Sequence, residues 1–384
     1  MKIVIASDSF KGSLSSIEVA QAATRGIKAV YPDCEVVAVN VADGGEGTVE
    51  AVVEALGGAI ITTTVSDPLS RPIQARYGIA GDTAIIEMAA ASGLPLLRPE
   101  ERNPWLTSTH GTGEMIMDAI RRGCRHFLVG IGGSATNDAG TGMLQAMGFR
   151  FYDIHEQEIL HCCGGTMHEI ARIDDTQVPE SLRQSVFTIA CDVDTPFCGK
   201  EGAAPVFAPQ KGADTTMVQR LDAGMVSLAQ VIESKYHINI VPIAGAGAAG
   251  GMGGAFRAFL NATLKRGIDM VLDAIHFDQT IQHADLILTG EGKIDFQTAK
   301  GKTAAGVLAR AKAQDIPVIA IGGCVEMCDS VEQLGFAGIY PILEEKVPLE
   351  VAMQPHFAAS NVEKTVKKIC TYHKFSVPLQ PEIK

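Results

Sequence analysis

The stretch KIVIASDSFKGS, residues 2–13, decides the fold. Residues 2–7 form a short apolar run that is typical of a buried parallel strand. Residues 8–13 then supply an acid, hydroxyls, a lysine and a glycine, which is typical of a loop. Ser15 and Glu18 have the spacing of a capping box, so a helix begins there. A strand, a polar loop and a helix in this order predict the first βα unit of a parallel sheet.

The same pattern returns after this unit and again near the end of the chain. EVVAVNVA at 35–42 is a second apolar strand. ADLILTGEG at 284–292 is a strand that runs into a glycine loop, and a helix is expected at 301–314. PVIAIGG at 317–323 and GIYPIL at 338–343 add two more strands. These segments predict that both chain ends build one parallel sheet.

The middle of the chain has a different pattern. Residues 61–79 alternate in polarity and contain two prolines, which predicts a hairpin or an antiparallel edge. HFLVGIGG at 126–133 and VFTIACDV at 186–193 are apolar strands that end in polar or glycine-containing segments. Helical spacing is found at 113–122 and at 214–235.

These patterns predict an α/β fold in two parts. The first is a parallel-sheet domain of the Rossmann or flavodoxin-like kind, formed by residues 1–64 together with 282–384. The second is a mixed α/β domain, residues 65–281, inserted into the first. The segment 375–384 contains two prolines and is expected to be peripheral.

Composition and charge exclude several classes of function. The 384 residues are 46% hydrophobic, which predicts a folded core, and the net charge is −12. A nucleic-acid or anionic-membrane partner needs a basic face, so neither is expected. The uncharged stretch 238–256 contains six glycines and a proline and is a poor membrane span. The N-terminus resembles no signal peptide.

The nine cysteines predict free thiols and a cytoplasmic location. Cys162 and Cys163 are adjacent to His161, but no second cluster has the spacing of a zinc site. A homo-oligomer is compatible with the sequence.

Four segments share a design that suits anion binding. In each, a strand is followed by glycines and by acidic, hydroxyl, amide or lysine side chains, at 8–13, 43–48, 132–142 and 290–303. Glycines let backbone N–H groups approach an anion. A strand-to-helix turn also uses glycines and capping residues, so any single loop has this simpler interpretation as well.

The sequence contains no complete named nucleotide motif. Gly301-Lys302-Thr303 resembles the end of a P-loop, but Phe296 stands where the first glycine is required. Residues 245–250 fit G-x-G-x-x-G, but the run before them contains proline and no clear βαβ unit follows. Helix packing or a phosphate-facing turn explains these glycines better than dinucleotide binding does.

Glycine loops with acids and lysines suit phosphoryl transfer. This reaction depends on positioning and on charge neutralisation, with Mg²⁺ held by one or two carboxylates and the phosphates. A carboxylate then accepts the proton of the attacking hydroxyl. The acids at or just past strand ends are Asp8, Asp43, Glu46, Asp138, Asp192, Asp194, Glu291 and Asp295.

Five segments together resemble the bacterial glycerate kinase family, the class unrelated to P-loop kinases. They are DSFKGS at 8–13, DGGEGT at 43–48, GIGGSATND at 130–138, CDVDTPFCG at 191–199 and TGEGKIDFQT at 289–298. The resemblance runs in order from residue 1 to about residue 375.

The resemblance implies ATP-dependent phosphorylation of D-glycerate with Mg²⁺, and a two-domain α/β architecture with one domain inserted in the other. Bacterial members of this type typically make 2-phosphoglycerate, which feeds glycolysis from glucarate, galactarate or glyoxylate breakdown. The same chemistry giving 3-phosphoglycerate, or acting on another small hydroxy acid, is the main alternative.

Chemistry, rather than the family, suggests roles for individual residues. Asp192 is the first candidate for the base that accepts the glycerate hydroxyl proton, and Asp43 is the second. Asp295 and Asp8 are candidate Mg²⁺ ligands.

The anion-binding candidates are cationic side chains and one loop. Lys11 and Lys293 would neutralise phosphate or carboxylate charge. The loop would hold phosphate oxygens through its N–H groups and side chains, and its residues are Gly132, Gly133, Ser134, Thr136 and Asn137.

Two other classes of function remain open at this point. A nucleotide-dependent oxidoreductase would use the glycines at 245–250, and NADH titration would detect it. A non-catalytic sensor of small acids would show no ATP turnover with any hydroxy acid.

Overall fold

Strand β1 (Lys2–Ser7) pairs with a parallel strand on each side in the computed structural model, which describes residues 1–372 except 46, 344 and 346. Ile3 of β1 stands opposite Val36 of β2 (Glu35–Asn40) and Leu286 of β11 (Leu286–Ile294). The sheet continues through β12 (Val318–Val325) to β13 (Gly338–Pro341). The order β2–β1–β11–β12–β13, all parallel, is the flavodoxin-like order.

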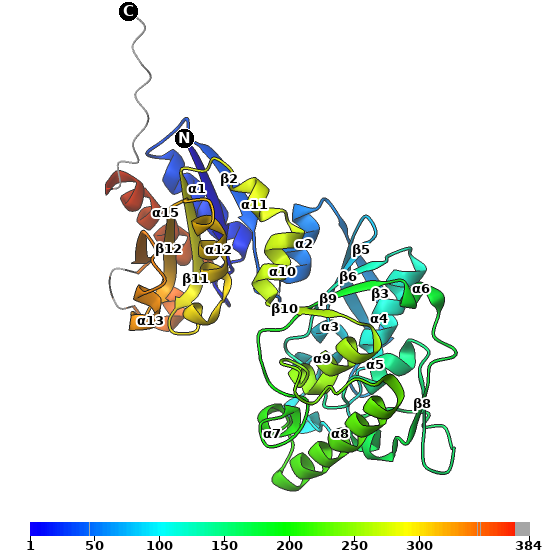
Figure 1. Cartoon of the computed structure of the whole chain (residues 1–384). Coiled ribbons are helices and arrows are strands. Elements are labelled where there is room, and N and C mark those ends of the chain that lie inside the picture. The colour runs from blue at the N-terminus through cyan, green and yellow to red at the C-terminus, as the bar shows by residue number, and fades with distance from the viewer. Residues whose placement is uncertain (46, 344, 346, 373–384) are drawn as a thin grey trace, which may run out of the picture. The chain divides into compact units, whose positions relative to one another are not determined.

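Helices cover both faces of this sheet (Figure 1). On one face α1 (Ser16–Lys28) and α15 (Pro355–Tyr372) enclose Ile3 and Ile5 of β1. On the other, α12 (Thr303–Lys312) packs against β11. The predicted capping box begins α1, since Ser15 Oγ accepts from Glu18 N at 3.3 Å and Ser15 N donates to Glu18 Oε2 at 2.8 Å. The fold predicted for the chain ends is therefore confirmed.

Short helices complete this part of the chain. They are α10 (Gly267–Ala274), α11 (Phe277–Thr280), α13 (Asp329–Glu332) and α14 (Leu349–Ala352), with a 3₁₀ turn at Thr298–Lys300.

The middle of the chain forms a mixed six-stranded sheet. Its order is β10–β9–β6–β5–β4–β3, and the four strands from β10 to β5 are parallel. The predicted antiparallel hairpin is present, as β3 pairs with β4 from Ala59–Ile79 to Ser66–Pro72. The strand bounds are β3 (Ala59–Ser66), β4 (Pro72–Ala80), β5 (Thr83–Glu87), β6 (His126–Gly130), β9 (Val186–Ala190) and β10 (Thr263–Lys265).

Helices and a small hairpin surround this second sheet. The hairpin is β7 (Arg150–Tyr152) with β8 (Arg172–Asp174). The helices are α2 (Thr48–Ala55), α3 (Ala89–Ser92), α4 (His110–Arg121), α5 (Thr141–Ala146), α6 (Glu180–Arg183), α7 (Ala203–Phe207), α8 (Thr215–Tyr236) and α9 (Ala248–Phe259), with a longer 3₁₀ turn at Gly164–Glu169.

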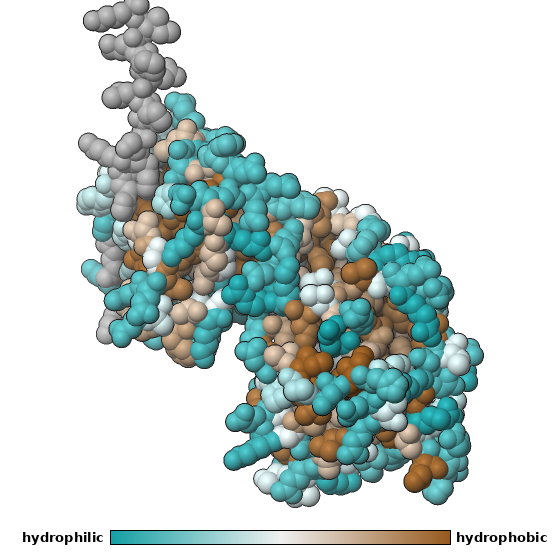
Figure 2. All heavy atoms as spheres, in the orientation of Figure 1, coloured by the Kyte–Doolittle hydropathy of each residue, from teal (hydrophilic) through white to brown (hydrophobic). Residues whose placement is uncertain are grey.

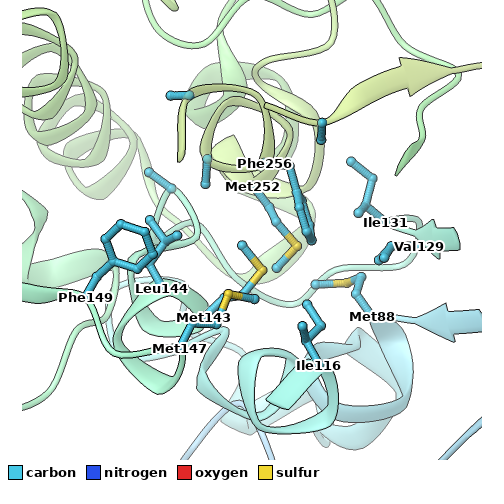
Figure 3. Close-up of a cluster of buried hydrophobic side chains, with 14 of the residues drawn as sticks. Met88, Ile116, Val129, Ile131, Met143, Leu144, Met147, Phe149, Met252 and Phe256 are labelled. Atoms are coloured by element: carbon cyan, nitrogen blue, oxygen red, sulfur yellow. The ribbon is translucent and has the colours of Figure 1, made fainter. Parts of the chain in front are cut away.

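Methionine fills the core between this sheet and its helices. Figure 3 shows Met143 and Met252 facing the ring of Phe256, with Met88 and Ile116 beside them, and all five side chains are fully buried. Unbranched thioether chains adapt to irregular gaps between helices. These methionines are thus core residues.

The boundaries between the two compact units differ from the domain boundaries that the sequence predicted. Residues 1–43 and the described part of 271–384 form one compact unit, called here the terminal unit, and residues 44–270 form the central unit. The predicted boundaries were 64 and 281. The difference arises because β3 pairs with β4 and α2 packs on β4 and β5, which places both in the central unit.

Two segments hold structure that the sequence did not predict. The region 150–184, which has no clear periodicity, contains the β7–β8 hairpin. The three residues of β10 lie between α9 and α10 and pair with β9. A strand this short gives no readable pattern. Glu46 and the segment 375–384 lie outside the described residues.

The visible surface is mainly hydrophilic, and the cysteines form no disulfides. Hydrophilic side chains cover most of the visible face of each unit (Figure 2). All nine cysteines are free thiols. Within the described part of the chain, no helix combines the length and the apolar character needed to cross a bilayer.

The close packing of α1 on α15 makes a testable prediction at Gly26. A β-carbon there would lie 2.6 Å from the carbonyl oxygen of Glu363. We expect Gly26→Ala to destabilise the terminal unit by about 1–3 kcal/mol, because overpacking outweighs the better helix propensity of alanine. Calorimetry would measure this. Gly132→Ala is the matched control, since nothing lies within 4 Å of the added carbon; equal stability of the two variants would contradict the tight packing.

Candidate active site

The predicted acids and lysines of the terminal unit line one cavity. It has a volume of about 500 Å³ and lies at the carboxyl ends of the parallel strands. β1 and β11 are the neighbours at which the strand order reverses, and ligands bind at such a switch point in open α/β sheets. The predicted site residues in the cavity wall are Asp8, Lys11, Asp43, Lys293 and Asp295.

Asp8 follows β1 directly and is buried. Its Oδ1 accepts from Ser9 N at 2.7 Å, and its Oδ2 accepts from Thr303 Oγ1, at the start of α12, at 3.0 Å. Burial raises the pKa of the Asp8 carboxyl above its usual value, and the charge of Asp43 raises it further. A cation in the cavity would relieve this repulsion.

Glu291 has the most perturbed carboxyl of the cavity. It lies inside β11, is 6% exposed and accepts a hydrogen bond from Thr298 Oγ1. Burial raises the pKa of Glu291 to about 7, with Asp8 and Asp295 adding to the rise and Lys302 opposing it. A titratable group so perturbed in a cleft is a candidate functional residue. Its position near a strand end marks Glu291 as one of the candidate acids in the sequence, but the pattern alone gives it no role.

Asp295 is tied to the same turn. Thr298 Oγ1 accepts from Asp295 N at 3.1 Å, so one threonine links the Glu291 side chain to the Asp295 backbone. Lys293 Nζ lies 3.4 Å from Asp295 Oδ2 and 2.9 Å from Glu326 Oε1. The TGEGKIDFQT segment therefore folds as a strand end and a 3₁₀ turn that fix two carboxylates at the cavity.

Carboxylate oxygens such as those of Asp8 and Asp295 are the kind of ligand that Mg²⁺ prefers. Among residues 1–372, the masked positions aside, no three His, Cys, Asp or Glu side chains come together as a metal site. Mg²⁺ bound with a nucleotide needs only one or two carboxylates, because phosphates and water complete its shell. Asp8 and Asp295 are suited to that role.

The remaining predicted residues lie in the central unit. The loop after β6 exposes Gly132 and Gly133 and half-buries Ser134, whereas Thr136 and Asn137 are fully buried. Asn137 Nδ2 lies 3.3 Å from Met225 Sδ. In the described structure neither Thr136 Oγ1 nor Asn137 Oδ1 has a hydrogen-bond partner. The accessible part of this loop is thus Gly132–Ser134.

A buried lysine that no sequence pattern indicates supports this loop. Lys211 is 1% exposed, and its Nζ donates to Ser134 Oγ and to the Thr136 carbonyl oxygen, each at 2.7 Å. Burial lowers the pKa of Lys211 to about 7, while the nearby charge of Asp138 works against that shift. Only the tertiary fold brings Lys211 here, since 75 residues separate it from Thr136.

Asp138 has a structural environment. It is fully buried and accepts from Thr109 N at 2.8 Å and from Thr109 Oγ1 at 2.7 Å. The backbone N–H groups of Gly140 and Gly142 also donate to it, at 3.1 and 3.2 Å. Four donors on one buried carboxylate hold the start of α5 against α4.

Asp192 follows β9, the strand next to β6. Its side chain is exposed, and Oδ1 accepts from the backbone N–H of Gly267 at 2.9 Å. The loops after β6 and β9 therefore end at the same edge of the central sheet, so Asp192 and the 132–134 segment share that edge.

The glycines at 245–250 serve packing. A β-carbon at Gly247 would lie 2.2 Å from the Pro196 carbonyl oxygen, and one at Gly250 would lie 2.2 Å from that of Thr136. The backbone here is in close contact with neighbouring loops, which supports the packing interpretation of the G-x-G-x-x-G match.

Comparison with known proteins gives one consistent result. The family model described as "Glycerate kinase family" matches residues 3–374. A glycerate kinase of Bacillus cereus (strain ATCC 10987 / NRS 248) is 46% identical over 379 residues, covering 98% of this chain and 99% of that protein. A glycerate 2-kinase of Escherichia coli (strain K12) is 44% identical over 357 residues, covering 92% and 93%.

A solved structure agrees. A crystal structure assigned as glycerate kinase 2 from Salmonella typhimurium LT2 matches with a TM-score of 0.89 at 42% identity, and the match covers 97% of this chain and 98% of that one.

The raised pKa of Glu291 predicts a pH-dependent loss of stability. Below pH 4.5 the carboxyl is protonated in both folded and unfolded chains; between 4.5 and about 7 only the folded chain keeps the proton. Stability contributed by Glu291 is therefore lost as pH rises through this window. In Glu291→Gln, which keeps an oxygen for Thr298, the gain in stability over wild type should grow across the window, by at most about 3 kcal/mol.

Urea unfolding at a series of pH values would measure this difference. Glu332→Gln removes a charge at an exposed glutamate of the same unit and is the control. A stability difference for Glu291→Gln that is the same at pH 4 and pH 8 would contradict the burial of this carboxylate.

Proposed function

Since this chain belongs to the glycerate kinase family, we propose that it transfers the γ-phosphoryl group of ATP to the 2-hydroxyl of D-glycerate, giving 2-phosphoglycerate and ADP. The chain is a kinase of this family, and ATP is its phosphoryl donor. The finer assignment of 2-phosphorylation is supported by the E. coli relative named glycerate 2-kinase.

One structural observation carries this proposal. A cavity at the switch point of a parallel sheet contains buried carboxylates whose charges repel, together with three lysines. Phosphoryl transfer needs that combination, because Mg²⁺ and ammonium groups must neutralise phosphate charge while carboxylates hold the metal. A hydride-transfer site needs no such set of acids.

Mg²⁺ is part of the proposal, with Asp8 and Asp295 as its protein ligands. When bound, the ion would neutralise charge on the phosphates. Lys11 and Lys293 would contact phosphate oxygens, and Lys302, at the start of α12, joins them in the cavity wall.

The glycerate hydroxyl needs a base to accept its proton. Asp192 is our first candidate, because it is exposed at a strand end and one oxygen is held by Gly267 N. Asp43 is the second candidate, and its place in the cavity wall supports it.

In the central unit we propose that Gly132, Gly133 and Ser134 hold phosphate oxygens through backbone N–H and hydroxyl groups. Thr136 and Asn137, predicted as direct contacts, are enclosed beneath this segment, so their contribution is to shape it.

We also propose a location in the cell and a metabolic role for the product. Nine free thiols support a reducing, cytoplasmic location. There the product would feed glycolysis from the breakdown of glucarate, galactarate or glyoxylate.

The position of phosphorylation can be read from the product. Incubation with ATP, Mg²⁺ and D-glycerate, followed by enolase alone, should yield phosphoenolpyruvate, because enolase accepts 2-phosphoglycerate and not the 3-isomer. ADP without phosphoenolpyruvate would reject 2-phosphorylation, and added mutase would then identify the 3-isomer. No ADP with glycerate would reject the substrate and direct the test to other hydroxy acids.

The proposed base predicts a specific kinetic loss. Asp192→Asn is nearly isosteric and should fold normally, while kcat should fall by about 10²–10⁴, the usual contribution of a general base. Asp194→Asn, at a nearby exposed aspartate of the same loop, is the matched control and should keep wild-type turnover. Wild-type kcat in Asp192→Asn would exclude it as the base, and Asp43→Asn would be measured next.

A further inference from the structure

We propose that the cavity of the terminal unit is the nucleotide site, with adenine against the apolar side chains that line it from Ile342, Leu343 and the described residues 347–358, and with the phosphates over the ends of β1 and β11. The proposal rests on the kinase activity proposed above and adds where the nucleotide binds and how it is oriented.

The cavity wall changes character across the sheet. Its charged side chains come from the segments after β1 and β2 and from the end of β11 and the turn after it. Its apolar side chains come mainly from the chain after β13, and they are Ile342, Leu343, Val347, Leu349, Ala352, Met353 and Ala358. Two strand spacings, about 10 Å in all, separate β11 from β13. A ligand that fits both ends is anionic at one end and flat and apolar at the other, as ATP is.

The size and position of the cavity suit such a ligand. Its volume of about 500 Å³ is within the usual range for small-molecule sites, roughly 300–1,000 Å³. Gly323 and Cys324 at the end of β12 line it between the charged and apolar parts, so the cavity is continuous along the strand ends.

Met353, which follows α14, contacts the charged loop after β1. A β-carbon at Gly12 would lie 2.8 Å from Met353 Cε, which shows that the methionine tip rests on the 8–13 loop. Leu349 lines the cavity yet is 74% exposed. A large apolar side chain exposed at a cavity edge is available to cover a bound aromatic base.

The G-x-G-x-x-G match at residues 245–250 is a less suitable nucleotide site, because the glycines in and after it are in close contact with neighbouring groups. A β-carbon at Gly254 would lie 2.7 Å from the Phe197 ring, and one at Gly253 would lie 2.3 Å from the Gly245 carbonyl oxygen. The glycines around 245–254 are thus occupied by packing inside the central unit.

Photoaffinity labelling of the full chain would locate the base directly. Azidoadenosine triphosphate carries its reactive group on adenine, and trypsin would release fragments 313–346 and 347–364, which together contain the apolar wall. We expect label in these fragments, suppressed by excess ATP. Label in fragment 236–257, which holds the G-x-G-x-x-G match, or no label that ATP suppresses, would overturn the site.

A matched pair of variants gives a second, independent measurement. Leu349→Asp puts a charge at the exposed apolar wall without disturbing the core, so ADP affinity by titration calorimetry should fall about tenfold or more. Leu160→Asp, in the central unit at a leucine that is 82% exposed, is the control and should bind ADP like wild type. Unchanged ADP affinity in Leu349→Asp would overturn the proposed place of adenine.

These tests are independent of the acceptor. If the apolar wall is labelled and Leu349→Asp weakens ADP binding, but glycerate is not phosphorylated, the nucleotide site is supported and only the glycerate assignment fails. If glycerate is phosphorylated while the label lies elsewhere, the glycerate assignment is supported and the proposed nucleotide site fails.

Discussion

The parallel pairing of β1 with β2 on one side and with β11 on the other is the constraint on which the structure depends. The β1–β11 contacts join the first residues of the chain to residues more than 280 positions away, so the terminal unit is built from segments at both ends of the chain. The strand order reverses at this pairing, and the loops after β1 and β11 lie together there. Asp8, Lys11, Glu291 and Asp295 share one cavity for that reason.

The carboxyl groups that give the cavity its chemistry lower the stability of the folded chain. Asp8 and Glu291 are carboxyl groups in surroundings that raise their pKa values, which means that their charged forms are disfavoured in the folded chain. Thr303 and Thr298 stabilise these carboxylates by hydrogen bonds without removing the repulsion. Active sites commonly hold such destabilised groups, because a substrate or metal completes their environment.

Local patterns in the sequence predicted much of this arrangement. Apolar runs at 2–7 and 284–292 gave strands of the right type, and the acids and lysines after them do line one cavity. The chain ends could be recognised as one sheet because their strands share the same buried, uninterrupted character.

Features that depend on tertiary burial could not be predicted in this way. Lys211 is remote in sequence from the loop it supports, and nothing around it marks it as buried. Glu291 looks like any acid near a strand end until burial perturbs its pKa. The unit boundary near residue 43 depends on the pairing of β3 with β4. The three residues of β10 are too few to form a recognisable sequence pattern.

We propose that nucleotide binds at the carboxyl edge of the five-stranded sheet. Hydrogen–deuterium exchange of backbone amides, with and without Mg²⁺–ADP, tests it most directly. Bound nucleotide should slow exchange in the 8–13 loop, at the end of β11 and in α14. Slower exchange confined to 130–138 and 245–254, with the edge of the five-stranded sheet unchanged, would contradict it.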